Sequence, residues 1–105
     1  MAWFYLILAG LFEIGWPLGF KLSQTTNYKY SWILFSIITM AMSGYFLYLA
    51  QKTIPIGSAY AVWTGIGSVG AFIIGILLLK DLVDAFKIVS VSFIIIGIVG
   101  LRISS

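Results

Sequence analysis

The sequence predicts an all-α membrane protein in which four helices cross the bilayer. Of its 105 residues, 62% are hydrophobic and only 9% are charged, and the mean hydropathy is +1.12. Soluble domains carry roughly 25% charged residues, so this chain lacks the polar surface that a water-facing globule needs. Uncharged runs long enough to cross about 30 Å of hydrocarbon recur along the chain, without the alternating polar positions of barrel strands.

The first helix is expected over about residues 2–22. Its apolar run is interrupted only by Glu13 and closes at Lys21, after which the polar stretch 23–27 indicates a loop. Residues 1–5 lack the basic region and the small-residue cleavage site of a secretory signal. We therefore expect the first span to remain as a membrane helix.

The next two helices are expected over about residues 30–51 and 55–79. A short connector at 52–57 separates them, because Pro55 suits the first turn of a helix and cannot sit comfortably in a helix interior. The second and third spans therefore run antiparallel, joined by a few residues at one membrane surface.

The fourth helix is expected over about residues 84–102, after a tight charged turn at 80–84 in which Asp84 is the expected N-cap. Its uncharged stretch, 88–101, covers about 14 residues or about 21 Å, less than the hydrocarbon thickness. The basic residues at both ends must therefore snorkel, or protein must cover this helix. The four helices form one transmembrane domain, 1–105.

Charge gives only a weak signal for orientation. Four spans place the two chain ends and the second connector on one side of the membrane. That side holds Lys52 and Arg102, and the other side holds Lys21, Lys29, Lys80 and Lys87. Under the positive-inside rule this small bias leaves two alternatives open: one topology with the lysine-rich loops in the cytoplasm, or insertion in both orientations.

Composition excludes several classes of chemistry. The chain has no cysteine and no histidine, which removes disulfides, thiolate sites, the usual metal ligand and the usual general base. We therefore expect no enzyme activity, no metal and no cofactor. The six basic residues are scattered singly rather than clustered, so no nucleic-acid partner is expected. The lipid bilayer is the one partner that composition predicts directly.

Glu13 lies about halfway along the first span, where a charged side chain costs roughly 2.5 kcal/mol or more. No lysine or arginine within the spans is placed to neutralise it, since Lys21 is two helical turns away. One interpretation is a protonated carboxyl group that is hydrogen-bonded inside the bundle. The functional alternative is a carboxylate that holds either a proton or a transported cation, but not both at once.

Aromatic residues on two spans favour a cation site. Trp16 follows Glu13 by three residues and shares its helical face, and Tyr60 and Trp63 share a face of the third span. The faces of aromatic rings attract cations. The alternative for each ring is packing or an interfacial position.

Two backbone features would let such a site move. Pro17 cannot donate a hydrogen bond to the carbonyl of Glu13, four residues back, so it should loosen or kink the helix there. Gly65 and Gly67 follow Trp63 and weaken helix propensity where bending would open or close a pathway. The alternatives are a static kink at the proline and close helix packing at the glycines.

The third span contains a specific motif, Pro-x-Gly-x-Ala-Tyr-Ala-x-Trp-x-Gly-x-Gly, over residues 55–67. Together with the chain length, the four short spans and Glu13, this motif resembles the small multidrug resistance family of proton-coupled exporters, over essentially the whole chain. The resemblance implies an antiparallel homodimer, with the fourth helices at the dimer interface and the first three helices of each protomer around one chamber. The family's fourth-helix motif matches at Ile94, Ile95, Gly97 and Ile98.

The resemblance also implies a mechanism of alternating access across the inner membrane, in which protons and substrate compete for the two membrane glutamates. Tyr60 and Trp63 would line the chamber, and Ser43 matches a hydroxyl that hydrogen-bonds the glutamate. Trp16 and the sequence Trp-Thr-Gly-Ile-Gly at residues 63–67 resemble the guanidinium-exporter branch of the family. We therefore expect export of small guanidinium-type cations. The alternative within the family is a multidrug exporter of quaternary ammonium and other lipophilic cations.

Three other classes of membrane protein remain open at this point. A proton-conducting ring subunit also carries a mid-membrane carboxylate, but it has no use for an aromatic cation chamber. A lipid-carrier flippase subunit would suit the four-helix architecture, but it has little need for Glu13. A structural adaptor would tolerate Glu13→Gln, whereas a coupled exporter would not.

Overall fold

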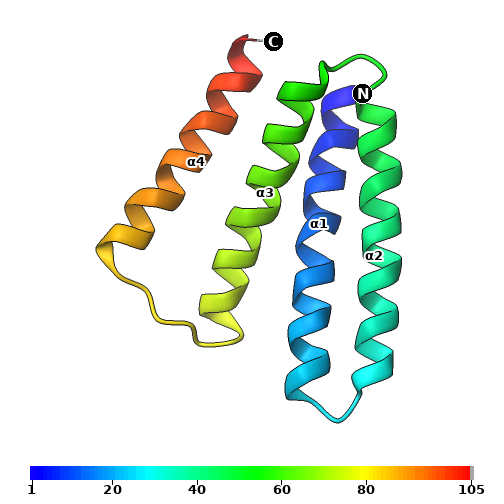
Figure 1. The fold of residues 1–105 in the computed structure, drawn as a ribbon. Coiled ribbons are helices and arrows are strands. Elements are labelled where there is room, and N and C mark those ends of the chain that lie inside the picture. The colour runs from blue at the N-terminus through cyan, green and yellow to red at the C-terminus, as the bar shows by residue number, and fades with distance from the viewer. Residues whose placement is uncertain (105) are drawn as a thin grey trace.

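The computed structural model describes residues 1–104 as four helices that run alternately up and down (Figure 1). Their bounds are Ala2–Thr25 for α1, Lys29–Ala50 for α2, Ile56–Leu77 for α3 and Ala85–Ser104 for α4. Each helix has at least 20 residues and is long and apolar enough to cross a membrane. The prediction of an all-α protein with four membrane-spanning helices is therefore confirmed.

The helices form a thin layer. In Figure 1, α1 lies between α2 and α3, and α4 leans on the far side of α3. The Cα envelope measures 44 × 34 × 16 Å, so its shortest dimension is less than about two helix widths. For this reason α4 has no buried residue over its described length, and large apolar side chains cover the outside of the layer.

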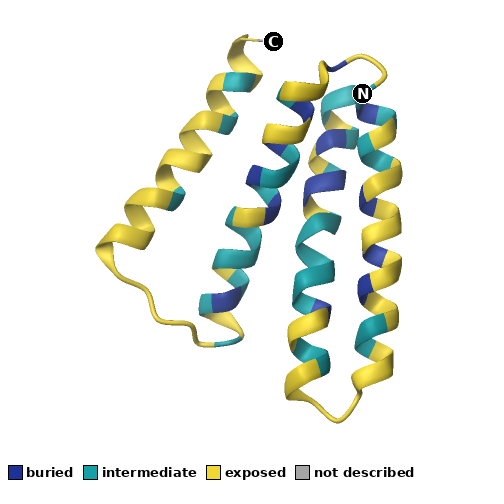
Figure 2. Cartoon of the chain, viewed as in Figure 1, coloured by how far each residue is buried: buried dark blue, intermediate teal, exposed yellow. Residues whose placement is uncertain are grey.

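Small residues bring α1 and α2 close together. Gly15 of α1 packs against Thr39 of α2, and Gly19 packs against Ser36. The Ser36 hydroxyl donates a hydrogen bond of 2.9 Å to the backbone carbonyl of Trp16. Figure 2 shows buried positions of α2 on the side that faces α1. Such close approach is how helices associate in a membrane, where apolar side chains gain little by leaving lipid.

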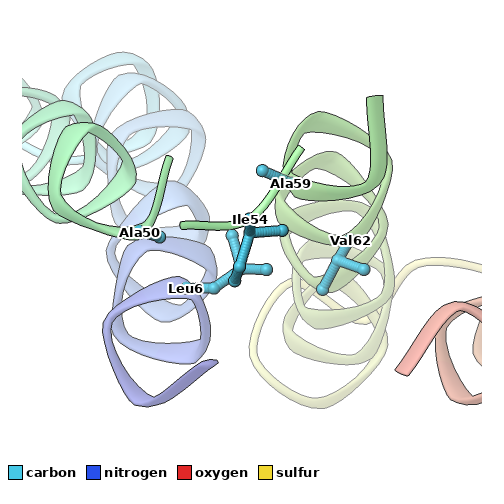
Figure 3. Close-up of a cluster of buried hydrophobic side chains, with 5 residues drawn as sticks. All are labelled: Leu6, Ala50, Ile54, Ala59 and Val62. Atoms are coloured by element: carbon cyan, nitrogen blue, oxygen red, sulfur yellow. The ribbon is translucent and has the colours of Figure 1, made fainter. Parts of the chain in front are cut away.

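A cluster of buried apolar side chains holds α1, α2 and α3 together near the chain's N-terminal end (Figure 3). Its members are Leu6, Ala50, Ile54, Ala59 and Val62. Ile54 belongs to the connector between α2 and α3 and is only 5% exposed. The connector is therefore pinned over the N-terminal half of α1, which sets how α3 lies against α1.

The first helix is longer than predicted. The polar stretch 23–27 was expected to form a loop, but α1 continues to Thr25. The Ser23 hydroxyl donates to the Phe20 carbonyl at 2.6 Å, and the Thr25 hydroxyl donates to the Lys21 carbonyl at 3.2 Å. Because these side chains bond to carbonyls of their own helix, they do not end it, and the predicted boundary was wrong.

The connection from α3 to α4 also differs from the tight turn expected at residues 80–84. α3 ends at Leu77, and Lys80 adopts the left-handed backbone conformation, with φ of 57°. The Asp81 amide then donates to the Gly75 carbonyl at 2.9 Å, which closes the helix. The segment beyond Lys80 is irregular and open because the facing ends of α3 and α4 lie apart (Figure 1).

The start of the last helix agrees with the prediction. Asp84 directly precedes α4, and its Oδ1 accepts a hydrogen bond of 2.9 Å from the Lys87 amide, so the predicted N-cap is confirmed. The helix extends past Arg102 to Ser104. The Arg102 guanidinium lies 5.1 Å from the centre of the Trp3 ring, so a side chain from the last turn of α4 meets one from the start of α1.

Candidate functional site

The carboxylate of Glu13 accepts a hydrogen bond from Trp16 and lies within reach of the Ser43 hydroxyl. The indole Nε1 of Trp16 donates to Glu13 Oε1 at 2.6 Å, and the Ser43 hydroxyl lies 3.4 Å from Oε2. Trp16 comes from the next turn of α1 and Ser43 from α2. The Trp16 indole orients the carboxylate without cancelling its charge, so it can still attract a cation.

Ser43 links this carboxylate to the third helix. Its hydroxyl oxygen accepts a hydrogen bond of 2.8 Å from Trp63 Nε1 and lies 2.7 Å from the carbonyl of Ala9. A serine hydroxyl has only one proton to donate. It therefore donates either to the Ala9 carbonyl, which is nearer, or to Glu13. Trp63 thus contacts the site through Ser43 rather than through the carboxylate itself.

Tyr60 lies next to Trp63 on α3. The two rings are edge to face, with centroids 5.4 Å apart. Tyr60 is 56% exposed, so its own chain leaves one side of the ring uncovered. Of the residues predicted to bind substrate, the structure joins Glu13, Trp16, Ser43 and Trp63 in one hydrogen-bonded chain and places Tyr60 at the end of it.

A pocket of about 190 Å³ opens between α1 and α3 beside the carboxylate. It is lined by Glu13, Pro17, Thr64, Gly67, Ser68 and Ala71. The hydroxyls of Thr64 and Ser68 donate to backbone carbonyls of their own helix, those of Tyr60 and Thr64, each at 2.7 Å. Their oxygen lone pairs remain available, so the side-chain oxygens of this lining act as hydrogen-bond acceptors.

Thr64 and Ser68 were missed by the sequence reasoning. Both are polar, one helical turn apart, in a span that is otherwise almost entirely apolar. Together with Gly67 and Ala71 they follow the spacing of one helical face. This pattern could have singled them out, but the periodicity does not tell which face of α3 turns toward Glu13.

Two predicted hinge glycines allow close contact between helices. A Cβ atom on Gly67 would lie 2.5 Å from Cγ of Glu13, and one on Gly65 would lie 2.8 Å from Cδ1 of Ile98. Gly67 therefore makes room for the Glu13 side chain, and Gly65 lets α4 approach α3. The contacts support the packing alternative at both positions, and a hinge role stays a prediction.

Pro17 lies inside α1, which continues as a helix on both sides of it. It lines the same pocket as Glu13, one turn further along the helix. Its role in conformational change also stays a prediction.

The predicted dimer-interface residues lie on two sides of α4. Ile98 and Ile94 face Gly65 of the same chain. Ile95 is 44% exposed, and a Cβ atom on Gly97 would meet open space. Ile94 and Ile98 thus pack α4 against α3, whereas Ile95 and Gly97 belong to an uncovered face of α4.

Known proteins resemble this chain over nearly all of its length. A family model described as Small Multidrug Resistance protein matches residues 1–94. A protein named Guanidinium exporter from Yersinia pseudotuberculosis is 45% identical over 105 residues, with the whole of both chains covered. Proteins of the same name from Salmonella typhimurium (strain LT2) and Escherichia coli (strain K12) are 44% and 42% identical, covering all of this chain and 99% of each relative.

Proposed function

Because this chain belongs to the small multidrug resistance family, a family of multi-pass inner-membrane transporters, we propose that it exports small guanidinium-type cations in exchange for protons. The observation that carries the proposal is the Glu13 carboxylate, which the Trp16 indole orients and which lies beside a pocket whose side-chain oxygens accept hydrogen bonds. The relatives named Guanidinium exporter support the choice of substrate.

The pocket suits a guanidinium ion chemically. A guanidinium is planar and positively charged, and it offers N–H donors on every side but no acceptor. The side-chain oxygens of the pocket belong to Glu13, Thr64 and Ser68, and they present the acceptors that such an ion needs. A tetra-alkyl ammonium ion has no N–H for these oxygens and must rely on charge and apolar contact.

Exchange follows from competition for one carboxylate. When Glu13 is ionised it can hold the cation, and when it is protonated the cation has lost its counter-charge. Alternating access would expose the loaded carboxylate to one side of the membrane at a time. Protons from outside would then displace the substrate on that side of the membrane. The protonated carboxyl group would next face the inside and release its proton there.

Substrate binding is expected to weaken as the pH falls. Protonation of Glu13 removes the anion, so the apparent affinity should drop by up to about tenfold per pH unit where the carboxyl is mostly protonated. Binding of guanidinium in detergent, measured by intrinsic tryptophan fluorescence from about pH 5 to about pH 9, checks this. An affinity that does not change with pH would mean that Glu13 is not the competing group.

Guanidinium and singly alkylated guanidinium are expected to be transported faster than tetrapropylammonium. Trp16 donates to the carboxylate from one turn away, so its indole occupies space beside Glu13. Proton-coupled currents in proteoliposomes would measure the three cations side by side. Trp16→Gly should shift the preference toward bulky cations. Equal or faster turnover of tetrapropylammonium by the unaltered protein would instead indicate a multidrug exporter of lipophilic cations.

We also propose that the working unit is an antiparallel homodimer. The open face of α4, with Ile95 exposed and Gly97 in open space, and the small bias in basic residues support it. Two or three lysines added to one chain end or to a loop should fix the orientation of a protomer. Variants fixed in opposite orientations should be inactive alone and active together. Full activity of one fixed variant would contradict the proposal.

A further inference from the structure

Pro17 changes the hydrogen bonding of one backbone carbonyl in the middle of α1. It lies four residues after Glu13, inside a helix that continues on both sides. In a regular helix the amide of residue 17 would donate to the Glu13 carbonyl, but proline has no N–H. The proline ring also crowds that carbonyl and tilts it away from the helix axis. The Glu13 carbonyl therefore lacks its usual helical donor.

This carbonyl belongs to a stretch of α1 that lines the pocket. A helical carbonyl points along the axis toward the residue four positions on, so the Glu13 carbonyl lies between Glu13 and Pro17. Both residues line the pocket of about 190 Å³ between α1 and α3. Two hydroxyl groups of α2 lie within hydrogen-bond distance of backbone carbonyls of α1, but not of the Glu13 carbonyl. Ser36 contacts the carbonyl of Trp16, and Ser43 contacts the carbonyl of Ala9.

Ser68 presents a second acceptor across the same pocket. Its hydroxyl proton is donated to the Thr64 carbonyl at 2.7 Å. The lone pairs of the Ser68 oxygen are therefore what it offers to a ligand, and it acts as an acceptor. Ser68 lines the pocket from α3, whereas Glu13 and Pro17 line it from α1. A planar ion held by the Glu13 carboxylate would therefore have acceptors from two helices beside it.

We propose that two neutral acceptors bind those N–H groups of a guanidinium that the Glu13 carboxylate does not bind. One is the Glu13 backbone carbonyl, which lacks its helical donor because of Pro17, and the other is the Ser68 hydroxyl oxygen. This assignment rests on the proposed function and adds the residues that set its selectivity. The carboxylate supplies charge, which every cation can use. The two neutral acceptors favour only cations that carry N–H groups, so they discriminate against alkylated ions.

The test compares guanidinium with tetramethylguanidinium, which has the same charge but far fewer N–H groups. Pro17→Ala restores the helical N–H to the Glu13 carbonyl. It should weaken guanidinium binding by about tenfold, as expected for loss of one hydrogen bond to a charged group, and change tetramethylguanidinium binding by less than about twofold. Pro55→Ala, at the chain's other proline and outside the pocket, is the matched control and should alter neither affinity.

Ser68 gives an independent second variant. Ser68→Ala should weaken guanidinium binding by about three- to tenfold and leave tetramethylguanidinium almost unchanged, while Ser68→Thr, which keeps the hydroxyl, should restore the preference. Ser92→Ala is the control, because Ser92 makes the same kind of hydrogen bond to its own helix on α4.

The outcomes separate this inference from the proposed function. If the unaltered protein does not bind guanidinium, the proposed function fails. If it binds guanidinium but neither Pro17→Ala nor Ser68→Ala changes the preference between the two cations, the inference is wrong and the function stands. An equal loss for both cations would also overturn the inference, because it would show that these residues only shape the helices.

Discussion

Replacing Glu13 with glutamine is expected to abolish coupled exchange while leaving the fold and membrane insertion nearly unchanged. Glutamine has almost the same shape, and its amide oxygen can still accept the hydrogen bond that Trp16 donates at 2.6 Å. It cannot become ionised, so it can neither attract the cation nor take up a proton. Both halves of the exchange are lost at once.

Proton-driven uptake of guanidinium in proteoliposomes measures the effect. The loss should exceed about a hundredfold, because a charge-assisted interaction is replaced by a neutral one in a site away from water. Asp84→Asn is the matched control: it is the same change of acid to amide outside the site, and asparagine caps a helix about as well as aspartate. Substrate-driven proton flux that persists in the Glu13→Gln protein would refute the mechanism.

Replacing Gly67 with alanine is expected to cause the second-largest loss of transport. The new methyl group would lie 2.5 Å from Cγ and 3.2 Å from Cβ of Glu13, so the side chain must move. Movement of Cγ carries the carboxylate away from Trp16 and Ser43. A displacement of about 1 Å in such a site reduces rates by about a hundredfold.

This substitution separates function from stability. Alanine is a better helix former than glycine by about 1 kcal/mol, so helix propensity alone would make the variant more stable. Thermal unfolding in detergent and proteoliposome transport should be measured together. Gly57→Ala, on the same helix but with open space around it, is the control and should transport normally. Normal transport by Gly67→Ala would show that the carboxylate does not need its present position.

The number of spans and the choice of Glu13 as the candidate binding residue follow from the sequence because both depend on local properties. A run of apolar side chains must lie in lipid whatever its neighbours are, and a carboxylate within such a run is costly wherever the helix packs. The Asp84 cap is equally local, since its oxygen bonds an amide only three residues away. The motif at residues 55–67 identified the family for the same reason: it is a pattern along one span.

Helix ends were less accurate because they depend on competing hydrogen bonds. Ser23 and Thr25 are polar, which suggested a loop, but their hydroxyls bond to carbonyls of α1 and let the helix continue. At the other boundary, the left-handed Lys80 and the bond from Asp81 to Gly75 end α3 in a way that charge alone does not indicate.

Only the tertiary structure decided how α3 is rotated and how closely it approaches α1. The absence of a side chain on Gly67 lets Glu13 sit against α3, and this rotation brings Thr64 and Ser68 into the pocket. It also places Trp63 on Ser43 instead of on the carboxylate. Hydropathy cannot predict these contacts, because a helix that is apolar nearly all round has no preferred face in lipid. The face is chosen by small residues and hydrogen bonds between helices, which exist only once the helices have met.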